Sequence, residues 1–391
     1  MHSIVSLLTI NRNTSLDKLK NTLQKILQSL LSGKHIHHAV IAIETGDKSF
    51  RWIGAAGDAQ PGGLTMKEKT PFFIASVTKL YIAAAILKLY EQGKIDLDKP
   101  MSDYLPKSLI GGLHTIAGTD YTGQITIRHL LSHTTGLPDW LEDRPAKGKS
   151  MLEDIENEDD RFISIEEAIT FVREKLTPRF SPQPPDTRTK KIRYSDTNFQ
   201  LLIAILEHIT EKPVHQVFDE LIYQPHGLHN TYHPGYKPDE NLPEPATVWV
   251  EDKPFTQPLL FQSFRDLVST VDDQLAFMRG LITGKLFHNP ATAEIMQSGW
   301  NRFGIPRDMA ALRQPGWPIE YGMGIMRFKM PRLFTPFKSI PAVVGHTGAT
   351  GSWLFYCPDL DLYLCGTVDQ LTAAPVPYRL LPKLLRVMSE R

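Results

Sequence analysis

Residues 71–93 read PFFIASVTKLYIAAAILKLYEQG, and this stretch decides the fold of the chain. From Ser76 to Gln92 nearly every side of the pattern is apolar, which is typical of a helix buried all round. Gly93 then suits the C-terminal cap of that helix. Lys79 follows Ser76 by three residues, so a helix places both side chains on one face. The stretch therefore predicts a buried helix that begins with a hydroxyl and an amine side by side.

Strand patterns occur near both ends of the chain. Residues 15–32 read as an amphipathic helix, and His38–Glu44 and Phe50–Ile53 then read as strands. Near the other end, strands are predicted at Gly322–Phe328, Ala342–Gly345, Ser352–Tyr356 and Leu362–Val368, and a last helix at Pro377–Met388. We therefore expect one mixed sheet built from both chain ends, with an all-helical lobe from the middle.

The middle of the chain reads as mainly helical. Helices are predicted at 126–136, 165–175, 198–208, 213–222 and 270–282. Clustered charges and prolines mark 141–193 as a polar surface insertion, read as solvated and mobile, with substrate contact as the alternative. The predicted lobes are 15–75 with 258–391, which is α/β, and 76–257, which is mainly helical and carries the insertion.

Composition restricts the partners. The chain has 391 residues, and Lys+Arg and Asp+Glu are equal at 43 each. This balance gives no net electrostatic field that would attract nucleic acid or an anionic membrane, and it suits a small, uncharged or zwitterionic substrate.

No apolar run reaches the roughly 18 residues of a membrane span. The N-terminus shows no signal-peptide pattern, so a cytoplasmic location is the default, and a periplasmic or secreted one remains the alternative. The oligomeric state stays open.

The cysteines do not indicate a disulfide, and the histidines do not indicate a metal site. A hairpin around Pro358–Asp361 would pair Cys357 with Leu362 and Cys365 with Leu354, so the two thiols should not form a disulfide. His37 and His38 point to opposite faces of an extended chain, and no carboxylate or thiol follows at ligand spacing. We expect neither a metal site nor a cofactor.

The pair Ser76 and Lys79 suggests nucleophilic chemistry. Apolar neighbours should disfavour the charged form of the Lys79 amine, which is the direction that a base requires. An ordinary helix cap is the alternative reading of Ser76, and a second Ser-x-x-Lys match at Ser15 lies on the exposed amphipathic helix. The buried context favours Ser76 as the nucleophile.

Two further segments carry polar groups at element boundaries. Residues 193–199 read RYSDTNF at a loop–helix junction, where Tyr194 can shuttle a proton or, alternatively, belong to a helix-capping loop. Residues 345–351 read GHTGATG directly after an apolar strand, where glycines allow a backbone to approach a ligand or, alternatively, form a bulge.

Together, in this order, the three segments resemble the motifs of the serine β-lactamase and penicillin-binding family. Ser76-Val77-Thr78-Lys79, Tyr194-Ser195-Asp196 and His346-Thr347-Gly348 are similar to its first, second and third motifs. The similarity is to the branch of class C β-lactamases, DD-carboxypeptidases, D-amino-acid peptidases and related esterases. It implies the β-lactamase/transpeptidase-like fold, α/β plus all-α, in which helices flank an antiparallel sheet and a second lobe is helical.

The resemblance also implies the roles of the site residues. Ser76 would attack a carbonyl, and Lys79 and Tyr194 would share the proton transfers. The backbone N–H groups of Ser76 and Ala349 would form the oxyanion hole beside Gly348. His346 and Thr347 would hold the carboxylate or polar end of the substrate. The implied function is a serine hydrolase acting through an acyl-serine intermediate on esters or D-amino-acid amides and peptides.

Asp196 departs from the family pattern, which has Asn at this place. An ionised carboxylate cannot donate a hydrogen bond to the acylamino carbonyl of a β-lactam. It would also favour the charged form of Lys79. We therefore expect β-lactams to be poor substrates. A true β-lactamase and a non-catalytic binding protein on the same fold remain the alternatives.

Overall fold

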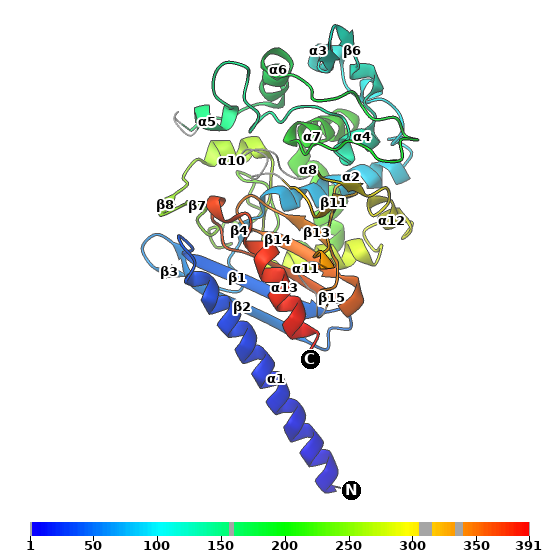
Figure 1. Cartoon of the computed structure of the whole chain (residues 1–391). Coiled ribbons are helices and arrows are strands. Elements are labelled where there is room, and N and C mark those ends of the chain that lie inside the picture. Colours follow the sequence, from blue (N-terminus) through cyan, green and yellow to red (C-terminus); the bar gives the residue numbers. More distant parts are fainter. Residues whose placement is uncertain (1, 156–159, 305–314, 333–338, 391) are drawn as a thin grey trace.

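The structure, a computed structural model, describes residues 2–155, 160–304, 315–332 and 339–390. Its centre is a nine-stranded antiparallel sheet in the order β10-β11-β12-β13-β14-β15-β1-β2-β3 (Figure 1). The strands are β1 (His38–Thr45), β2 (Arg51–Gln60), β3 (Leu64–Thr65), β10 (Asn301–Arg302), β11 (Ile319–Tyr321), β12 (Met326–Phe328), β13 (Val343–Thr347), β14 (Trp353–Cys357) and β15 (Leu362–Thr367). This confirms the β-lactamase/transpeptidase-like fold class, but the sheet that was expected to be mixed has only antiparallel pairings among its described strands.

The two ends of the chain meet in the middle of this sheet. Strand β1 pairs with β2 on one side and with β15 on the other, so residues more than 300 positions apart share a ladder. Cys357 lies opposite Leu362 and Cys365 opposite Leu354, which confirms the predicted register. Both thiols are buried and free.

Helices cover both faces of the sheet, which explains why all eight residues of β1 are buried. Ala39, Ile41 and Ile43 pack with α1 (His2–Leu31) and α13 (Val376–Met388). Val40 and Ala42 pack on the other side with α2 (Thr78–Glu91) and α11 (Val271–Ile282). Because side chains alternate along a strand, one run of apolar residues supplies both cores.

The apolar stretch that opens the sequence forms the buried helix as predicted, with one correction at its start. Ala75–Val77 form a 3-10 turn, and the α-helix begins only at Thr78. Gly93 adopts φ 69° at the C-terminal end, as its cap role required. Gly324, before β12, lies so close to α2 that an added Cβ would stand 2.4 Å from Cβ of Ala83. The helix is therefore held tightly between the sheet and the helical region.

Most of the remaining helices gather on the side of α2 away from α1, as Figure 1 shows, whereas α12 lies beside α2. The remaining helices are α3 (Lys107–Ile110), α4 (Ile127–Leu131), α5 (Met151–Ile155), α6 (Ile165–Lys175), α7 (Asp196–Thr210), α8 (Val214–Phe218), a π-helical turn (Asp219–Tyr223), α9 (Gln224–His226), α10 (Pro258–Phe264) and α12 (Thr292–Met296). Short two-stranded ladders join β4 (Phe72–Phe73) to β9 (Val268–Ser269), β5 (Thr115–Ile116) to β6 (Thr119–Asp120) and β7 (Trp249–Val250) to β8 (Lys253–Pro254). The lobe boundaries given above stay a prediction.

Several predicted boundaries differ from the observed ones for local reasons. The N-terminal helix begins at His2 instead of residue 15. The helix predicted over 126–136 ends at Leu131, because His133 adopts φ 55°, outside the helical range. The strand predicted from Gly322 begins at Met326, because Gly322 to Ile325 form the turn against α2.

The described part of the insertion is tied to the helical region. The backbone of Arg179 donates to the carbonyl of Gly136, and that of Arg193 to the carbonyl of His133. Nε2 of His129 lies 2.6 Å from the carbonyl oxygen of Gln183. Residues 156–159, within the charged run, lie outside the described residues. The described segments therefore form a hydrogen-bonded cover over α4.

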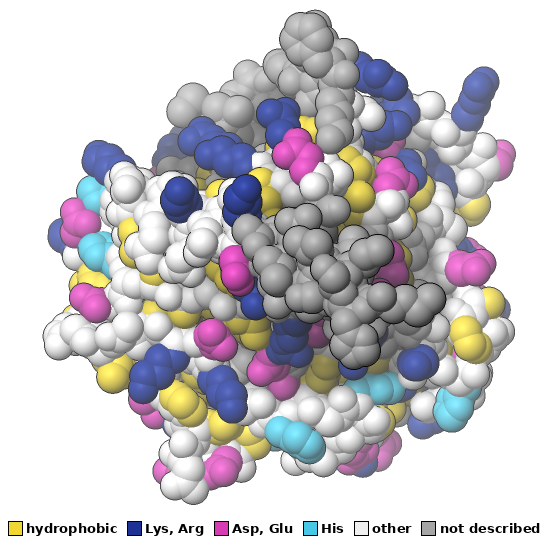
Figure 2. Space-filling view, turned by 90° about the horizontal axis from the view of Figure 1, so that it is seen from below, with side chains coloured by type: hydrophobic (Ala, Val, Ile, Leu, Met, Phe, Trp, Pro, Cys, Tyr) yellow, Lys and Arg dark blue, Asp and Glu magenta, His cyan; other side chains and the backbone are white. Residues whose placement is uncertain are grey.

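The surface matches the charge balance of the sequence. Lys, Arg, Asp and Glu side chains are interspersed over the face in Figure 2. Within the described ranges, no helix has both the length and the hydropathy that crossing a membrane would require.

The close contact between β15 and β1 gives a stability prediction. A Cβ on Gly366 would stand 2.2 Å from the carbonyl oxygen of Val40 and 2.5 Å from the Trp353 ring. Gly366→Ala should therefore lower the free energy of unfolding by about 1–3 kcal/mol, as overpacking does. Guanidinium denaturation measures it. Gly123→Ala is the matched control, since a Cβ there meets nothing within 4 Å, and it should change stability by less than about 0.5 kcal/mol. Equal losses in both variants would contradict the prediction.

Candidate active site

Ser76 lies on a strained turn that is braced by the β13–β14 connection. Ala75, directly before it, adopts φ 46°, a left-handed conformation that costs a non-glycine residue about 1–3 kcal/mol. The hydroxyl of Ser352 donates to the carbonyl of Ile74 (2.8 Å), and that of Thr350 to the carbonyl of Phe73 (3.1 Å). Surrounding contacts thus hold the turn, and the Ser76 side chain remains partly exposed.

Lys79 joins the first two sequence segments. Lys79 is 3% exposed, and its Nζ donates a hydrogen bond to Oγ of Ser76 at 3.0 Å. The same Nζ lies 2.5 Å from Oδ1 of Asp196. It also lies 5.1 Å from the centre of the Tyr194 ring. The sequence prediction that these four residues meet at one place therefore agrees with the geometry.

The charge on Lys79 corrects one expectation from the sequence. Burial lowers the pKa of the amine, as predicted, but the negative charges of Asp196 and Asp266 outweigh this, and the net pKa is raised. The amine is therefore protonated at neutral pH in the free protein. The apolar pattern around Lys79 could not show this, because the second carboxylate comes from residue 266.

Tyr194 is buried against aromatic rings at the same place. Its ring lies 4.5 Å from that of His133. Burial raises the pKa of the phenol well above its usual range, Asp196 adds to this, and a hydrogen bond with the side chain of Ser76 acts in the other direction. The phenol is protonated at neutral pH, so it is a proton donor in the resting site. Its catalytic role stays a prediction.

Two buried residues hold the Tyr194–Asp196 segment. Nδ1 of His133 accepts a hydrogen bond from the backbone N–H of Ser195 (3.2 Å), and the side-chain amide of Asn198 lies 3.0 Å from the same nitrogen. Oδ2 of Asp139 accepts from the backbone N–H of Asp196 (2.6 Å). Burial, with the charge of Asp196, raises the pKa of Asp139 to about 8. These contacts fix where Asp196 begins α7.

The third segment lies on β13 and is more deeply buried than the sequence suggested. His346 is fully buried, its Nε2 lies 3.1 Å from the Tyr321 hydroxyl, and its Nδ1 lies 2.6 Å from the carbonyl oxygen of Thr347. Burial and the charge of Lys79 lower its pKa to about 3, so the ring is neutral. The hydroxyl of Thr347 lies 2.9 Å from that of Tyr378 on α13. The substrate-holding roles of His346 and Thr347 stay predictions.

The turn after β13 suits an anion at its backbone. A Cβ on Gly348 would stand 2.2 Å from Oγ of Ser352 and 2.6 Å from the carbonyl oxygen of Ile74, so only glycine fits beside the nucleophile turn. Ala349 is exposed, and its backbone N–H has no acceptor among the described residues. A free N–H near the nucleophile is what an oxyanion hole needs, although that role stays a prediction.

Sequence reasoning missed several residues of the site. Asp266 and Tyr321 both act on the charge of Lys79, and burial raises the pKa of Asp266 to about 7 against the opposing charge of Lys79. The sequence near Asp266 carried no local signal, because the residue reaches Lys79 only through the β4–β9 pairing. His133, which holds the backbone of Ser195, is a further residue of this kind. Within the described ranges, no group of three or more His, Cys, Asp or Glu could hold a metal ion.

Comparison with known proteins agrees with this arrangement. The family model described as "Beta-lactamase" matches residues 23–376. The chain belongs to the beta-lactamase family. Among curated relatives of this beta-lactamase-family chain, esterase EstB of Burkholderia gladioli is 27% identical over 204 residues, 51% of this chain and 48% of the esterase. AmpH of Escherichia coli K12, a D-alanyl-D-alanine-carboxypeptidase/endopeptidase, is 23% identical over 343 residues, covering 86% and 80% of the two chains.

Solved structures share the fold of this chain at low sequence identity. D-amino acid amidase from Ochrobactrum anthropi SV3 superposes with a TM-score of 0.73 at 19% identity, covering 95% of this chain and 99% of that one. EstCE1, a hydrolase with promiscuous acyltransferase activity, gives 0.72 at 24% identity, covering 95% and 98%. The chain spans about half the length of EstB.

The charge balance at Lys79 gives a prediction that needs no substrate. Asp196→Asn removes the negative charge next to the amine and should lower the pKa of Lys79. Asp266→Asn should lower it as well. A pH titration of the lysine side-chain nitrogens by NMR, with Lys79 assigned from a Lys79→Arg spectrum, measures both effects. Asp98→Asn is the control, because Asp98 is paired with Arg128. An unchanged Lys79 pKa in both site variants would show that the carboxylates do not set it.

Proposed function

We propose that this protein is a serine hydrolase that acts through an acyl-serine intermediate on esters or on D-amino-acid amides and peptides. One observation carries the proposal: a partly exposed Ser76 has a buried amine 3.0 Å from its Oγ, and Tyr194 lies beside both. Family membership supports it. The names of two relatives, an esterase and a D-alanyl-D-alanine-carboxypeptidase, support the substrate classes.

In this reaction Oγ of Ser76 bonds to the substrate carbonyl carbon and its proton passes to a base. Neutral Lys79 is within reach of that proton, and its raised pKa makes the neutral form scarce at neutral pH, so acylation should accelerate as the pH rises. The backbone N–H groups of Ser76 and Ala349 would stabilise the oxyanion. The leaving group departs with a proton from Tyr194 or Lys79, and water then cleaves the acyl-serine ester and restores the Ser76 hydroxyl.

The carboxylates of the site favour some substrates over others. The side chain of Asp196 is 29% exposed, and Asp266 also acts on Lys79, so two acidic groups share one cation. Ionised carboxylates accept hydrogen bonds and cannot donate them. Substrates with a free amine, or simple esters that lack an acylamino carbonyl, should therefore bind better than penicillins and cephalosporins.

A β-lactamase is the second candidate, because the family model bears that name. It would need fast deacylation as well as acylation. A non-catalytic protein on the same fold is the third, and the contact between Lys79 and Ser76 argues against it.

Turnover of two substrate classes separates these candidates. Wild type should hydrolyse p-nitrophenyl acetate and butyrate, nitrocefin should react slowly, and Ser76→Ala should lose the ester activity by at least about 1000-fold. Initial rates of purified proteins measure this. Fast nitrocefin turnover would identify a β-lactamase instead. Equal rates of ester hydrolysis for wild type and Ser76→Ala would show that Ser76 is not the nucleophile.

The departure at Asp196 has its own test. Asp196→Asn introduces a hydrogen-bond donor for the acylamino carbonyl. It also removes the negative charge that raises the pKa of Lys79. Acylation by a fluorescent penicillin should therefore rise by about 10-fold or more. Gel fluorescence after timed labelling measures acylation directly, and Ser76→Ala controls for non-specific labelling. No gain in the Asn variant, with its fold intact by circular dichroism, would refute the argument from Asp196.

A further inference from the structure

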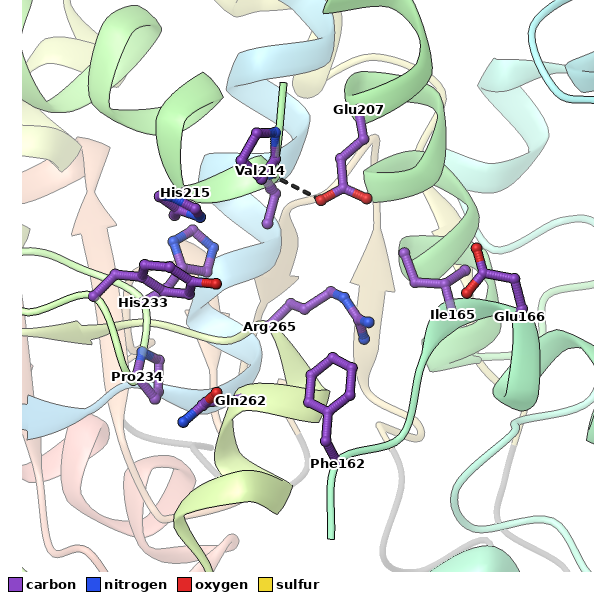
Figure 3. Close-up of a pocket in the computed structure, with 12 residues that line it drawn as sticks. Phe162, Ile165, Glu166, Glu207, Val214, His215, His233, Pro234, Gln262 and Arg265 are labelled. Carbon is purple, nitrogen blue, oxygen red and sulfur yellow. Dashed lines mark hydrogen bonds between the residues drawn. The ribbon is translucent and has the colours of Figure 1, made fainter. Parts of the chain in front are cut away.

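A second polar cleft of about 170 Å³ lies between α6, α7, α10 and the segment after α9 (Figure 3). Ser76, Lys79 and Tyr194 do not line it. Its walls include one guanidinium, two carboxylates and two exposed aromatic rings: Arg265, Glu207, Glu166, Phe162 and Tyr236. The proposed hydrolysis uses none of these groups.

The charges in the cleft face each other without pairing. Figure 3 shows the Arg265 guanidinium projecting between the Phe162 ring and the Glu207 carboxylate. Glu207 and Glu166 both act on the charge of Arg265, yet among the described residues neither forms an ion pair with it within 4.0 Å. Oε1 of Glu207 accepts a hydrogen bond from the backbone N–H of Val214 at 2.9 Å. Nη1 of Arg265 is held by Gln200 (3.1 Å) and by the carbonyl of Ser263 (2.6 Å). Nε and Nη2 of Arg265 have no hydrogen-bond acceptor in the part of the chain that the structure describes.

A buried histidine in the same wall lacks its hydrogen bonds. His233 is 4% exposed, and neither Nδ1 nor Nε2 has a partner among the described residues. An unsatisfied buried donor or acceptor costs about 1–3 kcal/mol, so such a group calls for an explanation. A ligand with polar atoms in the cleft supplies one.

Aromatic side chains flank these polar groups. Phe162 and Tyr236 are 48% and 53% exposed, and both line this one cleft. The Tyr236 ring stacks on His215 at 3.7 Å between centres. The guanidinium carbon of Arg265 lies 5.4 Å from the centre of the Phe162 ring. An apolar or aromatic group of a ligand would therefore meet ring faces beside the charges.

We propose that this cleft binds a small aromatic zwitterion, of the chemical class of an aromatic α-amino acid. Arg265 pairs with the carboxylate of the ligand, Glu207 and Glu166 with its ammonium group, and the rings of Phe162 and Tyr236 with its aromatic group. Both charges are needed, because a lone carboxylate would also face two glutamates and a lone amine would leave Arg265 unpaired.

Calorimetry with three matched probes tests this on full-length Ser76→Ala protein, in which turnover at Ser76 is abolished. Phenylalanine should bind with one-to-one stoichiometry. The single-charge analogues 3-phenylpropionate and 2-phenylethylamine should each bind at least 10-fold more weakly. Equal binding of an analogue, or no binding of phenylalanine, would overturn the proposal.

Variants of the two charged walls show where the probe binds. Arg265→Gln and Glu207→Gln, each in the Ser76→Ala background, should weaken phenylalanine binding at least 10-fold. Lys212→Gln is the matched control, because Lys212 pairs with Glu220 outside the cleft, and it should leave binding unchanged. Glu207→Gln keeps the test valid if Arg265→Gln fails to fold. Unchanged binding in Glu207→Gln would place the ligand elsewhere. Since the assay uses binding alone, its failure leaves the proposed hydrolysis untouched.

Discussion

The site depends on a charged amine kept inside the protein. Burial of Lys79 would be costly for an isolated ammonium group, since desolvation strongly disfavours the charged form. Asp196 at 2.5 Å, with Asp266 behind it, reverses that preference. The two carboxylates come from α7 and from the second residue before β9, so the charge balance requires that the buried helix, the helical region and the β4–β9 ladder all be in place.

A second constraint acts on the backbone next to this charge. The left-handed Ala75 persists because the residue before it is fixed: the backbone N–H of Ile74 donates to the carbonyl of Leu267, and the hydroxyl of Ser352 donates to the carbonyl of Ile74. Gly348 must lack a side chain for that contact to form. The apolar sheet therefore does more than fill a core, because the β13–β14 turn holds the nucleophile against the Lys79 amine.

Much of the fold could be predicted from the sequence, because its signals are local. The apolar helix, the alternating strands near both ends and the hairpin register at Cys357 follow from periodicity and turn residues. The family motifs also brought Ser76, Lys79 and Asp196 together correctly. The effect of Asp196 on the charge of Lys79 could be predicted, but those of Asp266 and Tyr321 could not, because these residues come near Lys79 only in the folded chain. The complete burial of His346 could not be predicted either, because its partner, the hydroxyl of Tyr321, lies on another strand.

One turn of backbone connects the two polar regions of the molecule. Arg265 ends α10 in a left-handed conformation (φ 57°), and Asp266 follows it directly. The side chain of Arg265 lines the second cleft, whereas Asp266 acts on Lys79 and bonds the side chain of Thr78. Arg265 also contacts Gln200, one helical turn after Asp196 on α7. A ligand that displaces Arg265 would therefore also displace the backbone next to Asp266 and the helix that begins with Asp196. These two residues carry the carboxylates that act on Lys79. Asp266 changes its charge near pH 7, whereas Lys79 stays protonated there, so a displacement of Asp266 would change the negative charge beside the amine without removing its proton.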